Sequence, residues 1–150
     1  MLMSLLGWQR RLAIAAIFFQ STYAFAGQLK IDIEGVTPGE GVVLVAIFPE
    51  AAASSFPIVK NENGIKLLSL DGNKQPLSTT VTLPNGNYAI SAFEDRNHDG
   101  ALALNGPYGS PSEPWGLSNN RKPRNRGPIF GDAVFSVGDG QNTQKIRLGL

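Results

Sequence analysis

The chain has 150 residues, of which 42% are hydrophobic and 17% are charged, and its formal net charge is +1. The lack of cysteine excludes disulfides, thiolate nucleophiles, cysteine zinc sites and the lipid-bearing cysteine of a bacterial lipoprotein, and a single histidine, His98, argues against two-histidine metal sites. The 17 glycines and 10 prolines predict many turns, but enough apolar residues remain to fold one domain.

Residues 1–26 have the pattern of a signal peptide. Two arginines precede an apolar run over Leu12–Phe19, and the segment ends in Ala24-Phe25-Ala26, with the small residues that signal peptidase requires. The run is shorter than the roughly 20 apolar residues of a membrane-spanning helix. We therefore expect cleavage after Ala26, export to the periplasm or beyond the cell, and a mature domain over residues 27–150 with no transmembrane segment.

Cleavage at this point also changes the charge of the protein. Loss of the two arginines turns the formal charge from +1 to −1. A nearly neutral domain has no strong field to attract phosphate groups, so nucleic acid and anionic lipid are not expected as partners.

The rest of the chain predicts short strands separated by turns. Over Gln28–Ile33 apolar and polar residues alternate, as in a strand with one buried face. Gly41–Phe48 is a continuous apolar run rich in β-branched residues and is predicted to be the central strand. A single helical turn is predicted at Glu50–Ser55. Further strands are predicted at Ile65–Leu70, Thr79–Leu83, Asn87–Phe93, Ala133–Val137 and Lys145–Leu150.

These seven strands, without a long amphipathic helix, predict an all-β fold. The expected architecture is a seven-stranded antiparallel β-sandwich, immunoglobulin-like or prealbumin-like, and a small barrel is the alternative. Turn residues at Pro84–Asn87 and Gly138–Gly140 predict hairpins.

One long loop interrupts the strand pattern. Asn105–Gly131 holds five glycines and five prolines in 27 residues, together with Tyr108, Trp115, Ile129 and Phe130. Compact domains rarely keep so long a loop without a use, and its aromatic residues predict that it packs on the sandwich. The basic cluster at 121–126 inside it is interpreted as a solvated loop, with a partner-binding patch as the alternative.

A calcium-loop pattern lies directly before the long loop. Asp95, Asn97 and Asp99 occupy positions 1, 3 and 5 of D-x-[DN]-x-[DN]-G, and Gly100 occupies position 6. Oxygen ligands at alternate positions converge when the backbone curls around an ion, and the next ligand is expected to be the backbone carbonyl of Ala101. The candidate cofactor is Ca²⁺ or another hard cation.

The pattern is incomplete at position 12, where Gly106 replaces the bidentate glutamate of the motif. Glu113 is the candidate for the missing carboxylate, with Glu94 as the second choice. The alternative is an Asx-rich turn whose side chains bond their own backbone and hold no ion. His98 is expected to point outward and has no identified catalytic partner.

An enzymatic interpretation rests on fewer features. Glu94 or Asp95, paired with Glu113, would make a carboxylate-based hydrolase acting on an envelope polysaccharide or peptide. No serine stands in a nucleophile elbow. A third hypothesis is an accessory domain of the cell envelope that offers a sheet edge to another protein.

Three blocks of the sequence carry a resemblance to a known family. Leu83–Ile90, Phe93–Gly100 and Gly109–Asn120, in this order, resemble the uncharacterised bacterial family called domain of unknown function 2141, over roughly Gln28 to Leu150. The resemblance implies an exported protein and assigns no reaction. The first block is also similar to the strand entry of transthyretin-like and carboxypeptidase-regulatory sandwiches, which implies a prealbumin-like fold. The family pattern falls on Asp95, Asn97, Asp99, Gly100, Pro111, Glu113, Gly116, Ser118 and Asn119.

We therefore expect an exported, non-enzymatic β-sandwich in which a long loop forms a site for a small-molecule ligand or an envelope protein. For the neighbouring loop two alternatives stand: closure by Ca²⁺ through Asp95, Asn97, Asp99, Ala101 and Glu113, or an Asx-rich turn that holds no ion.

Overall fold

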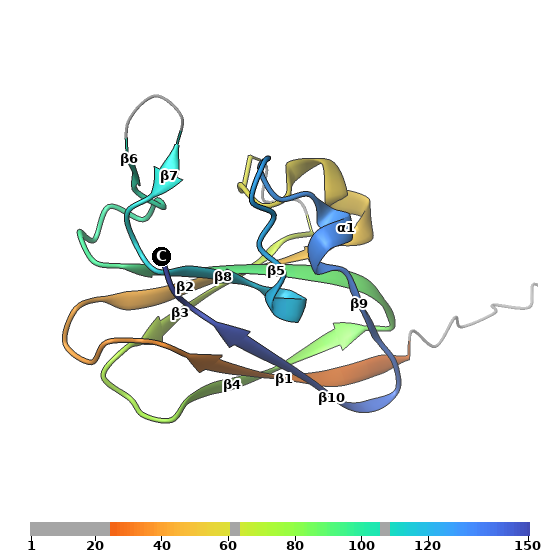
Figure 1. Ribbon diagram of the computed structural model, residues 1–150. Helices are drawn as coiled ribbons and strands as arrows, with labels where there is room; N and C mark the ends of the chain where they lie inside the picture. The colour runs from red at the N-terminus through yellow and green to blue at the C-terminus, as the bar shows by residue number, and fades with distance from the viewer. Residues whose placement is uncertain (1–24, 61–63, 106–108) are drawn as a thin grey trace, which may run out of the picture.

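A computed structural model describes residues 25–60, 64–105 and 109–150 (Figure 1). The predicted signal peptide lies outside the described residues except for Phe25 and Ala26, and Tyr108 of the long loop also lies outside them. Among the described residues, none of the helices has the length and apolar character needed to cross a membrane.

Two sheets and one short ladder account for the strands. The first sheet has the order β10-β1-β4, with β1 at Ala26–Glu34, β4 at Leu77–Pro84 and β10 at Gly140–Arg147. The second has the order β3-β2-β5-β8, and β9 also pairs with β5. Its strands are β2 (Val42–Pro49), β3 (Lys66–Asp71), β5 (Gly86–Asp95), β8 (Trp115–Leu117) and β9 (Phe135–Val137). The ladder joins β6 (Leu104–Asn105) to β7 (Ser110–Pro111).

The main core lies between the two sheets. Leu29, Ile31 and Ile33 of β1 are all buried, as their alternation predicts, and they face Val43, Val45 and Ile47 of β2 across the same cluster. Strands β4, β5 and β10 add further apolar side chains to it. Burial of this cluster holds the sheets face to face.

A second core covers the outer face of the second sheet. Phe48 of β2 and Phe56 lie edge to face with ring centroids 5.2 Å apart, and Phe56 meets Phe130 in the same way at 6.2 Å. The covering elements are η1 (Glu50–Ser55) and α1 (Phe130–Ala133), and Figure 1 shows both on the side of this sheet that faces away from the first. The turn η2 (Ser118–Asn120) follows β8 and lies against β10. Because both faces of β2 are buried, its sequence is apolar without alternation.

The all-β prediction is confirmed, with corrections in detail. The described residues hold ten strands, not seven, and β1 and β10 run parallel, so the strands are not all antiparallel. The helical turn over Glu50–Ser55 is confirmed as η1. The segment predicted as a strand over Ala133–Val137 contains the end of α1 and then β9, and the last strand begins at Gly140 and ends at Arg147 instead of covering 145–150.

Both predicted hairpins are wrong. Pro84–Asn87 joins β4 of the first sheet to β5 of the second, and Gly138–Gly140 joins β9 to β10 in the same manner. Turn residues specify a change of direction, but they carry no information about which sheet the next strand enters.

Candidate functional site

The end of β5 turns into a short loop that is organised by the side chain of Asp95. Side chains alternate along β5, so Asp95 falls on the outer face with Ser91 and Phe93, whereas Glu94 continues the inner face. Asp95 is 3% exposed, and its Oδ2 accepts the backbone N–H of Gly100 at 2.9 Å. Gly100 has a φ of 77°, in the left-handed region that glycine adopts without strain, which lets the loop close on this carboxylate.

The next two predicted site residues form Asx turns within the loop. Asn97 Oδ1 accepts the Asp99 N–H at 3.1 Å, and Asp99 Oδ1 accepts the Ala101 N–H at 2.8 Å. Asn97 Nδ2 also donates to Asp99 Oδ2 at 2.8 Å. His98 lies between them with a φ of 60° and is exposed.

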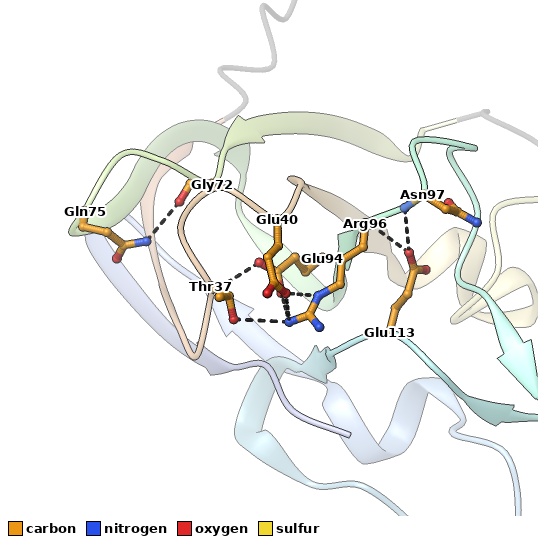
Figure 2. Close-up of polar contacts among 8 residues, drawn as sticks. All are labelled: Thr37, Glu40, Gly72, Gln75, Glu94, Arg96, Asn97 and Glu113. Carbon is orange, nitrogen blue, oxygen red and sulfur yellow. Dashed lines mark hydrogen bonds and ion pairs between the residues drawn. The ribbon is translucent and has the colours of Figure 1, made fainter.

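Glu113 comes to this loop as predicted and meets backbone amides there. Its Oε1 accepts the N–H of Arg96 at 2.7 Å and that of Asn97 at 3.4 Å, and its Oε2 accepts the N–H of Ala103 at 2.9 Å. The side chain is 4% exposed. These contacts give Glu113 the role of an anchor that ties both ends of the loop to the segment before β8. Figure 2 shows the contacts at the first end, with Arg96 and Asn97.

Glu94 belongs to a separate ion-pair cluster on the other side of β5. Its carboxylate is fully buried and accepts the backbone N–H of Thr37 at 2.9 Å and the Arg96 guanidinium at 2.8 and 3.1 Å. Arg96 also pairs with Glu40 at 2.9 Å (Figure 2). The cluster fastens the turn between β1 and β2 to the end of β5.

Two observations define what the loop offers to a cation. Within the described residues, no three His, Asp or Glu side chains gather into a group that could hold a metal ion. Asp95 Oδ1 is buried and is the one side-chain polar atom of the described residues that is buried without a hydrogen-bond partner.

Beside the loop, a groove of about 1030 Å³ runs over the outer face of the second sheet. Its floor is made by β2, β3, β5 and β8, including Phe93 and Trp115. Its walls are the segment after η1 at 57–59, the loop residues Gly100–Leu102, and the chain at 123–128. The long loop thus packs on the sheet as predicted, and the groove lies beside it.

Arg124 and Arg126 of the long loop line one wall of this groove, whereas Lys122 of the same basic cluster does not line it. Arg126 forms a two-pronged pair with Asp132, at 2.7 and 2.8 Å, and this pair together with the Ile129 N–H lowers the pKa of Asp132 to about 2. Lys122 lies 4.4 Å from the centroid of the Trp115 ring, where burial lowers its pKa.

Comparison with known proteins places the chain in a family. Residues 31–145 match the model of a family described as an uncharacterized protein conserved in bacteria (DUF2141). The chain belongs to this family. No curated protein shows a significant match to this DUF2141 domain. No solved structure shows one either.

The charge distribution in the groove of the DUF2141 domain was not evident from its sequence. Among the described residues that line the groove there is no aspartate, glutamate or histidine, and the charged ones are Arg124 and Arg126. The three acids considered for hydrolysis, Glu94, Asp95 and Glu113, are 0%, 3% and 4% exposed and do not line it. The ion pairs of Arg96 with Glu94 and Glu40 were also not predicted. The sequence signal that could have separated Glu94 from the loop is the alternation along β5, which places its side chain on the face opposite Asp95.

Proposed function

We propose that this protein is a non-enzymatic binding protein whose groove holds an elongated ligand with an apolar body and an acidic group. The observation that carries the proposal is the composition of the groove: the described residues that line it are apolar apart from a few polar groups, and the charged side chains among them are Arg124 and Arg126. Its volume of about 1030 Å³ lies just above the roughly 300–1,000 Å³ that is typical of small-molecule sites.

Exposed apolar side chains support a ligand at this place. Ile58, Leu67 and Leu104 are 64%, 49% and 54% exposed, and all three line the groove. Apolar surface gathered in this way on a folded domain is typical of an interaction site, because a ligand that covers it removes it from water.

Arg124 is the group expected to meet the acidic end of the ligand. Both terminal nitrogens of Arg126 already bind Asp132, which neutralises that guanidinium. In the described part of the chain the Arg124 side chain has no hydrogen bond or ion pair, so its donors are available to a carboxylate or another anion.

Two dyes with the same aromatic body and different charge test this proposal. Anilinonaphthalene sulfonate is anionic and phenylnaphthylamine is neutral. We expect both to bind, with energy transfer from Trp115, and we expect Arg124→Ala to weaken the anionic dye by about tenfold while leaving the neutral one unchanged. Arg121→Ala is the matched control, because Arg121 lies in the same basic segment but does not line the groove. Equal losses in the two variants, or no binding of either dye, would contradict the proposal.

We prefer binding to hydrolysis because of the position of the acids. A glycosidase needs two carboxyl groups that reach the substrate, about 5–9.5 Å apart. Here the Glu94 carboxylate accepts hydrogen bonds from Arg96 and Thr37, and the Glu113 carboxylate accepts hydrogen bonds from three backbone amides. The alternative remains testable by incubating the protein with envelope polysaccharide and peptide and measuring release of reducing ends and free amines.

Export and the finer fold are also proposed. The arginines, apolar run and Ala24-Phe25-Ala26 support cleavage after Ala26, and N-terminal sequencing of the protein from the periplasm or the medium tests it. Two sheets with a shared core support a sandwich related to the prealbumin type, which an experimental structure tests.

A further inference from the structure

The loop after β5 contains a buried carboxylate oxygen that meets no donor. Asp95 is 3% exposed, and its Oδ2 is occupied by the Gly100 N–H at 2.9 Å. Its Oδ1 has no hydrogen-bond partner among the residues that the structure describes. A buried carboxylate oxygen without a donor destabilises the fold unless a positive charge compensates it.

Other oxygens of the loop stand at the spacing that lets them join Asp95. Since the Asp95 carboxylate bonds across the loop to Gly100, the residues between these two positions curl around it. Asn97 and Asp99 present side-chain oxygens at alternate positions of this curl, and the carbonyl of Ala101 follows. An oxygen that accepts one N–H, as Asn97 Oδ1 and Asp99 Oδ1 do, keeps a second lone pair for a cation.

We propose that the loop Asp95–Ala101 binds one Ca²⁺ ion through Asp95 Oδ1, the side-chain oxygens of Asn97 and Asp99, and the Ala101 carbonyl. All four donors are hard oxygens, and two of them belong to carboxylates. Ca²⁺ accepts six to eight oxygen ligands in flexible geometry and completes its shell with water, whereas Mg²⁺ demands a near-ideal octahedron. With two carboxylates, the expected dissociation constant is on the order of 10⁻⁴–10⁻³ M.

Glu113 is a positioning residue in this site and not a ligand. Its two oxygens accept the N–H groups of Arg96, Asn97 and Ala103, which lie at the beginning of the loop and just after its end. The loop is therefore held in its curled form before the ion arrives, which reduces the ordering cost of binding.

The cation site and the groove share a wall but rest on different donors. Gly100 and Ala101 line the groove, whereas Asp95, Asn97 and Asp99 do not. Failure of the dyes to bind therefore leaves the cation proposal standing, and failure of calcium binding leaves the groove proposal standing.

Calorimetric titration and thermal unfolding of the wild-type protein with CaCl₂ and MgCl₂ test the site. Asp99→Asn is the informative variant, because Asp99 is exposed and asparagine can still accept the N–H of Ala101. The variant gives up only the exposed bond from Asn97 Nδ2, so the fold is retained. Asp71→Asn is the matched control. Asp71 is an exposed Asx-turn residue that accepts the N–H of Asn73 at 3.0 Å, and among the described residues its carboxylate has no buried oxygen without a hydrogen-bond partner.

We expect one Ca²⁺ per chain and a rise in Tm of about 5 °C or more at about 10 mM Ca²⁺. Asp99→Asn should weaken binding by about tenfold or more, and Asp71→Asn should leave it unchanged. No heat and no change in Tm in the wild type would overturn the site, as would equal binding by Asp99→Asn. Equal affinity for Mg²⁺ would overturn the assignment to Ca²⁺.

Discussion

Replacement of Glu113 by glutamine tests whether its carboxylate anchors the loop after β5. Glutamine has the same shape, but one of its two ends is an NH₂ group that cannot accept a hydrogen bond. If its oxygen stays with Arg96 and Asn97, the 2.9 Å bond from the Ala103 N–H is lost, and if it turns around, the 2.7 Å bond from Arg96 is lost. Either orientation removes at least one short bond to a buried charged acceptor.

The magnitude follows from that single bond. A hydrogen bond to a charged group contributes about 1.5–3 kcal/mol, and Glu113 is 4% exposed, so solvent does not replace the lost acceptor. We therefore expect Glu113→Gln to lower the free energy of unfolding by about 2–3 kcal/mol, which is about 8–12 °C in Tm for a domain of this size.

Urea denaturation in calcium-free buffer measures this change, with an unchanged m-value as the sign that only stability has altered. Glu50→Gln is the control, because Glu50 is exposed and accepts only the amide of Asn87 at 3.1 Å, so its change should stay within about 0.5 kcal/mol. If the two variants unfold at the same urea concentration, the hydrogen bonds of Glu113 do not anchor the loop.

Three further substitutions probe other contacts of the fold. Ser118→Ala removes a fully buried hydroxyl that accepts a backbone N–H of β5 at 2.9 Å, and it should lower the free energy of urea unfolding by about 1–3 kcal/mol. Asp132→Asn should lower the Tm at neutral pH, because Arg126 holds the pKa of Asp132 at about 2, below its usual 3.8. That stabilisation is complete above about pH 4, and the Tm difference from wild type should vanish as the pH falls through about 2. Gly41→Ala should cost about 1–3 kcal/mol in urea unfolding, because its Cβ would clash with the backbone carbonyl of Asp95 at the end of β5, whereas Gly138→Ala meets nothing within 4 Å and should be neutral.

Strands with buried side chains were predictable, and strands held by backbone pairing were not. Over Gln28–Ile33 the alternation identifies β1, and every apolar side chain expected inside is inside. By contrast, β10 begins with the polar residues Gly140–Gln144, which pair with β1 along its edge and send few side chains into the core. A strand of this kind leaves little periodic signal, because its hydrogen bonds involve only the backbone.

The candidate site was likewise only partly predictable from the sequence. The oxygen spacing from Asp95 to Asp99 and the approach of Glu113 were expected from the sequence. The partners of Glu113 were not, because acceptance of three backbone amides depends on the path of the chain after the loop. The groove needs three separate segments to meet over one sheet, and the role of Arg96 needs the turn between β1 and β2 to come beside it, neither of which is encoded locally.

The parallel pairing of β1 with β10 sets a time order for folding. Gly27 lies beside Gly140 and Glu34 beside Arg147, so the strand that pairs with β1 on this side lies more than a hundred residues further along the chain. Contacts of such long separation form slowly, since the intervening chain must first be brought together. The first sheet therefore stays one strand short, and the core between the sheets incomplete, until residues 140–147 are in place beside β1.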